Sequence, residues 1–118
     1  MSKFVETTYT NKKEILKFPD HYVNVAVTVS DAGVTAVNGK KIVPAGTILG
    51  GGFLANESVQ AKKTNGVGAE GVLFNDVDVT YGPAPGAAII HGFVALEKLP
   101  EAPSAEAVTA LKQITFLK

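Results

Sequence analysis

The sequence predicts a mainly β, small single-domain protein with one short C-terminal helix and an extended N-terminal arm. Valine occupies every second position through residues 23–29, and glycine or proline interrupts the later apolar runs at short intervals. A chain of 118 residues fits one domain with its own core. We expect roughly six or seven short strands in a small barrel or sandwich, rather than any βαβ arrangement.

The clearest strand lies at residues 22–29. Its alternating valines, from Val23 to Val29, fall on one face because successive side chains of a strand point to opposite sides. Asn38-Gly39 then stands between two β-prone runs and predicts a type I′ hairpin turn. Further strands are expected at 47–49, 71–79, 87–96 and 113–117, with a rigid turn at 81–86 and a loop over 56–70 that contains a weak strand at most.

A short helix is predicted near the C-terminus. Ser104 is suited to cap a helix over about residues 105–112, although Ala107 stands where a capping box needs an acidic residue or glutamine. We expect Val108 and Leu111 to face the core.

The composition argues against several partners and chemistries. Eleven acidic residues balance 11 basic ones, which are all lysine, so neither net charge nor an arginine fork favours nucleic acid or an anionic membrane. The absence of cysteine excludes disulfides, thiolate metal sites and thiol nucleophiles. With no apolar leader and no membrane-spanning stretch, we expect a soluble chain made in the cytoplasm without a signal peptide. Since 46% of the residues are hydrophobic, we expect some apolar surface to contact another chain.

Two patterns could bind a small ligand. Residues 66–71 match G-x-G-x-x-G, but a β run follows them instead of the helix that a dinucleotide site needs, so we interpret these as loop glycines. Asp76 and Asp78 share a predicted strand face and could hold a hard cation or perform acid–base chemistry. A solvated strand face explains this pair better.

The remaining candidates are the histidines and the lysine pairs. His21 and His91 are the only histidines, too few for a zinc site without cysteine, and we expect His91 to be half-buried and hydrogen-bonded rather than a catalytic base. The lysine pairs at 12–13, 40–41 and 62–63 are expected to be solvated in turns or loops. We therefore predict no catalytic residue, no metal site and no cofactor, and a protein that is not an enzyme.

The second half of the chain carries an order of motifs that resembles a known family. These are Val43-Pro-Ala-Gly-Thr-Ile-Leu-Gly50, Glu70-Gly-Val-Leu-Phe-Asn-Asp-Val-Asp-Val79 and, after a Pro/Gly turn, Ala88-Ile-Ile-His-Gly-Phe-Val94. Over about residues 40–118 the chain resembles the head decoration proteins of tailed bacteriophages and the related head-fibre-type capsid proteins of phages of Gram-positive hosts. The first third of the chain carries no motif of that family.

The resemblance implies both a fold and a function. The fold would be a small β-barrel or β-tulip-like domain. The function would be that of a virion structural protein, a cement or decoration protein that binds the major capsid protein on the outside of an expanded phage capsid, as a homotrimer. No nucleic acid, membrane or small-molecule substrate is implied.

The same resemblance suggests how the capsid is bound. Residues 1–20 would form an arm ahead of a β-rich domain at 21–118, and Ser2, Lys3, Phe4 and Val5 would contact the capsid, with Phe4 and Val5 adding to a sheet edge. A terminus without fixed structure is the alternative for this segment.

Two other functions remain open from the sequence. One is a β-sandwich module that binds carbohydrate or another surface ligand, with loop residues such as Tyr81 and Asp76 lining the site. Its weakness is the absence of tryptophan for stacking on sugars. The other is a small hydrolase that uses His91 with Asp76 or Asp78.

Overall fold

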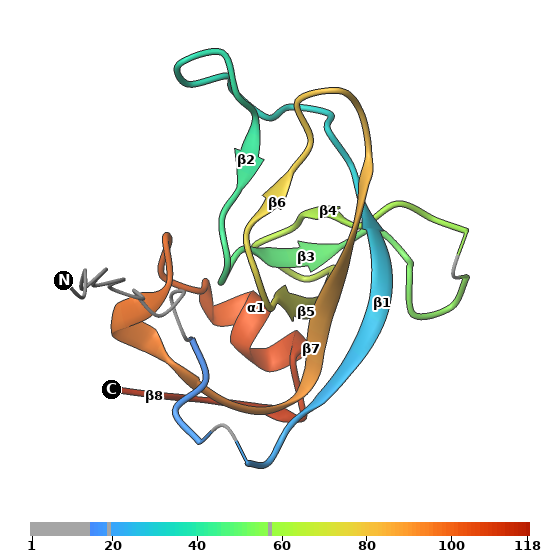
Figure 1. The fold of residues 1–118 in the computed structure, drawn as a ribbon. Coiled ribbons are helices and arrows are strands. Elements are labelled where there is room, and N and C mark those ends of the chain that lie inside the picture. The colour runs from blue at the N-terminus through green and yellow to red at the C-terminus, as the bar shows by residue number, and fades with distance from the viewer. Residues whose placement is uncertain (1–14, 19, 57) are drawn as a thin grey trace, which may run out of the picture.

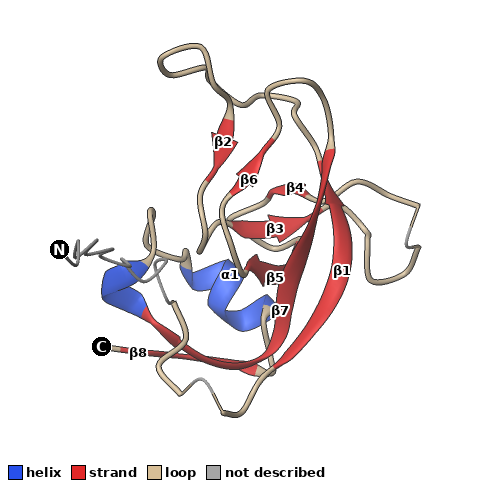
Figure 2. Ribbon diagram, in the orientation of Figure 1, coloured by secondary structure: helices blue, strands red, loops and turns tan. Residues whose placement is uncertain are grey.

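Among the residues that the structure describes, strands make up most of the regular structure and the helices lie in the C-terminal third of the chain (Figure 2). The computed structural model describes residues 15–18, 20–56 and 58–118. Its elements are β1 (Val23–Val29), β2 (Ile42–Val43), β3 (Ile48–Gly50), β4 (Lys62–Lys63), β5 (Ala69–Leu73), β6 (Val77–Asp78), β7 (Ala84–Ala95), the 3₁₀ helix η1 (Leu96–Lys98), α1 (Ala105–Ala110) and β8 (Ile114–Leu117). The predicted mainly β domain with one short C-terminal helix is confirmed.

The 12-residue strand β7 is the central element (Figure 1). Its first part lies between β1 and β5, both antiparallel to it, and the sheet continues to β3 and β4. Its last part, from Gly92 to Ala95, pairs with β8 in parallel. Strands β2 and β6 form a separate antiparallel pair. One long strand therefore joins most of the described sheet.

The main sheet is buried on both faces, against two hydrophobic clusters. Ile48, Val72 and Ile89 face one cluster, whereas their neighbours Leu49, Leu73 and Ala88 face the other. This follows from the period of two along a strand, and it explains why these strands read as continuous apolar runs. The first cluster is completed by residues from α1, β8 and the entering chain, and the second by residues from β1, β2 and β6.

The connection from β7 to β8 corrects one expectation. These two strands are parallel neighbours, and parallel neighbours need a crossover connection. Residues 96–113 supply it and include η1 and α1, so the chain contains one βαβ unit where we predicted none.

Three predicted elements have different bounds in the structure. The strand expected at 71–79 is two strands, β5 and β6, because β5 pairs with β3 and β7 while β6 turns away to pair with β2. The turn expected at 81–86 is shorter, since Ala84 already pairs with Val29. The loop expected at 56–70 contains the two-residue strand β4 and the first residues of β5.

The helix α1 begins as predicted but presents another face to the core. The Ser104 hydroxyl accepts a hydrogen bond from the Ala107 N–H at 3.0 Å, as an N-cap should. The helix ends at Ala110, and Leu111 is buried just beyond it. The expectation for Val108 is wrong, because Val108 is 44% exposed and Ala107 packs inward instead.

The predicted hairpin at Asn38-Gly39 is confirmed. Both residues have positive φ, 53° and 78°, which a type I′ turn requires. Val37 and Lys40 exchange two backbone hydrogen bonds of 2.8 and 3.1 Å across it. The ladder stops after this bridge, because Ile42 and Val43 pair with β6 instead.

The sheet order does not close into a barrel through the named strands of the described chain. Its two ends, β1 and β4, nevertheless come together at one parallel bridge between Val29 and Ala61. There the Ala61 N–H donates to Thr28 and the Ser30 N–H donates to Ala61, both at 2.8 Å.

The packed domain begins earlier than the boundary at residue 20 that we expected. Ile15 and Leu16 are buried in the first cluster. The Ala95 N–H donates to the Ile15 carbonyl and the Lys17 N–H to the Phe93 carbonyl, each at 2.8 Å. Residues 15–17 therefore run along β7 as part of the domain, and only residues before them are left for an arm.

A glycine in β3 provides a test of the sheet packing. A Cβ at Gly50 would clash with the Gly68 carbonyl oxygen and lie 2.9 Å from the Thr64 Cβ, whereas a Cβ at Gly66 meets nothing within 4 Å. We expect Gly50→Ala to lower the free energy of unfolding by about 1–3 kcal/mol or more. The matched variant Gly66→Ala should stay within about 0.5 kcal/mol of wild type. Denaturant unfolding measures both, and equal stabilities would contradict this packing.

Candidate functional site

Three large apolar side chains are exposed where the chain enters β1. Phe18, Tyr22 and Val23 are 47%, 40% and 49% exposed, and we call them the entry patch. The Phe18 ring packs edge-on against Phe93 at 5.3 Å, and the Tyr22 ring stacks on Phe74 at 5.4 Å. Aromatic contacts therefore hold Phe18 and Tyr22 against the domain while part of each side chain still faces solvent.

The two histidines meet beside this patch. Their Nε2 atoms lie 3.1 Å apart, and the ring centroids lie 5.1 Å apart with the rings at 70°. The strand register places them together, because Val23 of β1 pairs with His91 of β7 and His21 lies two residues before Val23. We predicted a hydrogen-bonded His91, but its partner, 70 residues away in sequence, was not predictable from local patterns.

The β2–β6 pair lies towards the other end of β1 (Figure 1), and three large apolar side chains in and beside it are exposed. Val37, Ile42 and Tyr81 are 66%, 40% and fully exposed, and we call them the β2–β6 tip. Nearby, the side-chain and backbone hydrogen bonds that Thr80 donates to Asp78 lower the pKa of this carboxyl below its ordinary value of 3.8. The Asp78 carboxylate thus has its hydrogen-bond partner, Thr80, only two residues along the chain.

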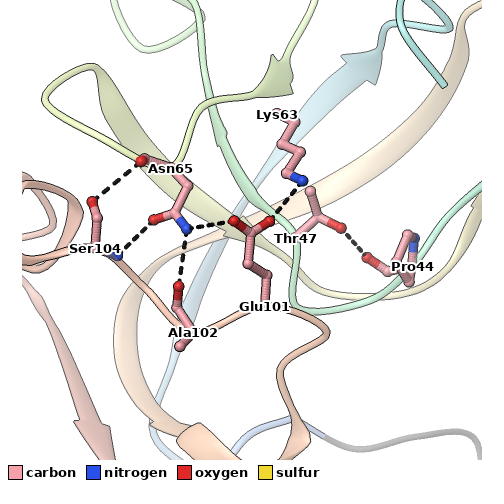
Figure 3. Close-up of polar contacts among 7 residues, drawn as sticks. All are labelled: Pro44, Thr47, Lys63, Asn65, Glu101, Ala102 and Ser104. Carbon is pink, nitrogen blue, oxygen red and sulfur yellow. Dashed lines mark hydrogen bonds and ion pairs between the residues drawn. The ribbon is translucent and has the colours of Figure 1, made fainter.

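A pocket of about 230 Å³ opens between β3, the chain after β1 and the linker before α1. Asn65 organises its polar side (Figure 3). The Asn65 amide donates to Glu101 and to the Ala102 carbonyl, and its side-chain oxygen accepts from the Ser104 N–H at 2.7 Å. Lys63 forms an ion pair with Glu101 at 2.6 Å. These contacts tie the β4 region to the start of α1.

The residues named for the alternative functions do not meet. Asp76 accepts a hydrogen bond from the Ala45 N–H at 2.7 Å, and neither Asp76 nor Tyr81 lines the pocket. His91 has His21 as its side-chain partner, and no contact with Asp76 or Asp78 is found in the described chain. Neither the sugar-binding set nor the hydrolase set is assembled.

The G-x-G-x-x-G segment has structural roles. Its last three residues belong to β5, so no helix follows it to receive a pyrophosphate. Glu70, inside the motif, accepts hydrogen bonds from the backbone N–H groups of Gly52, Phe53 and Leu54. These three hydrogen bonds hold the loop after β3 against β5.

The structure describes two of the three lysine pairs and none of the arm residues that we predicted to contact the capsid. Lys40 closes the turn at Asn38-Gly39 and Lys41 follows it, whereas Lys62-Lys63 forms the exposed two-residue strand β4, within the loop where we expected a weak strand at most. The arm residues Ser2, Lys3, Phe4 and Val5, and the pair Lys12-Lys13, lie outside the described residues.

In residues 15–18, 20–56 and 58–118, no three histidine or carboxylate side chains cluster closely enough to hold a metal ion by themselves. No helix in this part of the chain has the length and apolarity needed to cross a membrane. No protein-family model matches the chain, and no curated protein matches it either.

The contacts of Glu101 predict a pH dependence of stability. The ion pair with Lys63 and the hydrogen bond from Asn65 hold the pKa of Glu101 below its ordinary value of 4.5. A lowered carboxyl pKa stabilises the fold above that value, and the stabilisation is lost as pH falls through the folded-state pKa. We expect Glu101→Gln to be less stable than wild type at pH 7.

The difference should begin to shrink as the pH falls below 4.5 and should disappear only below the lowered folded-state pKa, where the wild-type carboxyl is protonated in both the folded and the unfolded state. Chemical denaturation at several pH values measures it. Glu97→Gln is the matched control, since no ion pair of Glu97 is found in the described residues. A Glu101→Gln effect that does not change with pH would show that the charge makes no contribution.

Proposed function

We propose that this chain is a virion structural protein that binds the outer surface of a phage capsid and cements or decorates it, as a homotrimer. The observation that carries the proposal is the entry patch. Three large apolar side chains stay exposed on a domain whose sheet is already buried on both faces. Exposed large apolar and aromatic side chains are enriched at protein–protein interfaces.

The position of the entry patch supports the arm in this proposal. Leu16 bridges Val94, so the described chain enters the domain already paired with β7. The arm, predicted to contact the capsid through Ser2, Lys3, Phe4 and Val5, precedes this segment in sequence. An extended segment can add a strand to the edge of a capsid sheet, while the entry patch adds apolar contact next to it.

The β2–β6 tip supports the trimer. A protein that binds both a shell and its own copies needs two separate surfaces, and the entry patch and the tip lie towards opposite ends of β1 (Figure 1). Contacts repeated over three subunits gain avidity, so each can be weak. In this proposal the partner is the major capsid protein, the protein sits on the outer capsid surface after synthesis in the host cytoplasm, and it is not an enzyme.

We also propose the finer fold, a small barrel of the β-tulip type. Its support is the bridge between Val29 and Ala61, which joins the two ends of the sheet order β1-β7-β5-β3-β4. The second hydrophobic cluster contains residues of β1, β3, β5 and β7 together with Ala61, as the interior of such a barrel would.

Deletion of residues 1–10 tests the arm. We expect the truncated protein to occupy expanded capsids of the encoding phage at least about tenfold less tightly, since an intramolecularly linked second contact contributes avidity. Cosedimentation with capsids lacking the protein measures occupancy. The unfolding midpoint should match wild type, because the packed domain begins by Ile15. Unchanged occupancy would remove the arm from the mechanism, and no binding by the full chain would refute the proposal itself.

The oligomeric state tests the trimer. We expect light scattering to give the mass of three chains for the free protein, or cryo-electron microscopy of occupied capsids to show groups of three. A chain that is monomeric both in solution and on the shell contradicts this part of the proposal.

A further inference from the structure

The two imidazoles have an arrangement that a simple surface histidine lacks. His21 and His91 are the only histidines of the chain, and the fold turns the same ring atom, Nε2, of each towards the other at 3.1 Å. No other side-chain hydrogen bond of either ring is found in the described residues. The pair is also open to solvent, since His21 is exposed and His91 only half-buried.

The separation of the two nitrogens suits a shared metal ion. Zinc–imidazole bonds are about 2.0–2.1 Å long, so two Nε2 atoms on one tetrahedral zinc ion lie about 3.3 Å apart. The observed 3.1 Å is within a few tenths of an ångström of that value. To bind one ion, both Nε2 lone pairs have to converge on a point beside the line that joins the two nitrogens.

The surrounding packing already holds the rings in place. His91 is fixed on β7 by its pairing with Val23. The His21 ring lies 6.0 Å from the Phe93 ring, which also packs against Phe18. Gly92 lets the two segments approach, since a Cβ there would lie 3.2 Å from the Tyr22 Cβ and 3.4 Å from the His21 carbonyl oxygen. Preorganised ligands lose less conformational freedom when a metal binds.

Metal binding also requires a particular tautomer of each ring. In the hydrogen-bonded pair, one ring donates its Nε2–H and the other accepts through its Nε2 lone pair. Metal binding needs both Nε2 lone pairs, so the donating ring must carry its proton on Nδ1 instead. That is a change of tautomer, and no proton is released overall.

Two histidines fall short of the four protein ligands of a closed zinc site, and we predicted no metal site from the sequence. From the geometry of the pair we nevertheless propose that His21 and His91 form an open, two-nitrogen site for a divalent transition-metal ion, with Zn²⁺ and Cu²⁺ as the preferred ions. Imidazole suits both metals, and Cu²⁺ binds the same ligands more tightly. The described chain adds no third ligand close by, so water fills the remaining positions. The site does not depend on the proposed capsid function.

Metal titration of the full-length protein tests the site. We expect isothermal titration calorimetry with Zn²⁺ to show one ion per chain, and we expect His21→Asn or His91→Asn to weaken binding at least about tenfold. The control Asp31→Asn, which removes a half-buried carboxylate just after β1, should bind Zn²⁺ as wild type does. Circular dichroism verifies that each variant is folded.

Electron paramagnetic resonance with Cu²⁺ gives a second readout. The wild-type spectrum should show hyperfine coupling to two imidazole nitrogens, and each single variant should show one. Zn²⁺ affinity that is unchanged in the double variant, or a wild-type Cu²⁺ spectrum without two imidazoles, would overturn the proposal and leave only a hydrogen-bonded histidine pair.

Discussion

The rest of the structure depends on the pairing of β7 (Ala84–Ala95) along its whole length. Its first half joins β1 to β5, and its second half lies between β8 and the entering residues 15–17. Small residues make this possible: a Cβ at Gly86 would lie 2.9 Å from the Val77 Cγ2. Side chains of β7 enter both hydrophobic clusters: Ile89 and Val94 lie in the first and Ala88 lies in the second.

The same strand positions the features from which function is argued. Its outward side chains His91 and Phe93 receive His21 and Phe18, and Gly92 between them allows close approach. The entry patch and the histidine pair thus share one support. A capsid bound at the entry patch and a metal ion bound at the histidine pair would therefore lie next to each other. Each proposal nevertheless rests on its own evidence.

Features that depend on nearby residues were predictable, and those that depend on distant partners were not. The turn at Asn38-Gly39 and the cap at Ser104 follow from local backbone geometry. The prediction of which side of α1 faces the core was wrong, because a helix of six residues carries too few apolar residues to define a face. Ala107 is buried in the core and Val108 is exposed. The βαβ unit was missed because strand direction is decided by pairing with β7.

The sequence by itself determined that this is a mainly β chain with alternating valines, tight glycine turns and one short capped helix, because these features are set by φ preferences and side-chain period over a few residues. Only the tertiary structure decided which ends of those strands are buried: Val29 is 1% exposed and Val23 is 49% exposed on the same strand. The tertiary structure also decided that His21 contacts His91. Sheet register sets a contact between residues 70 apart, and the sequence around neither histidine indicates it.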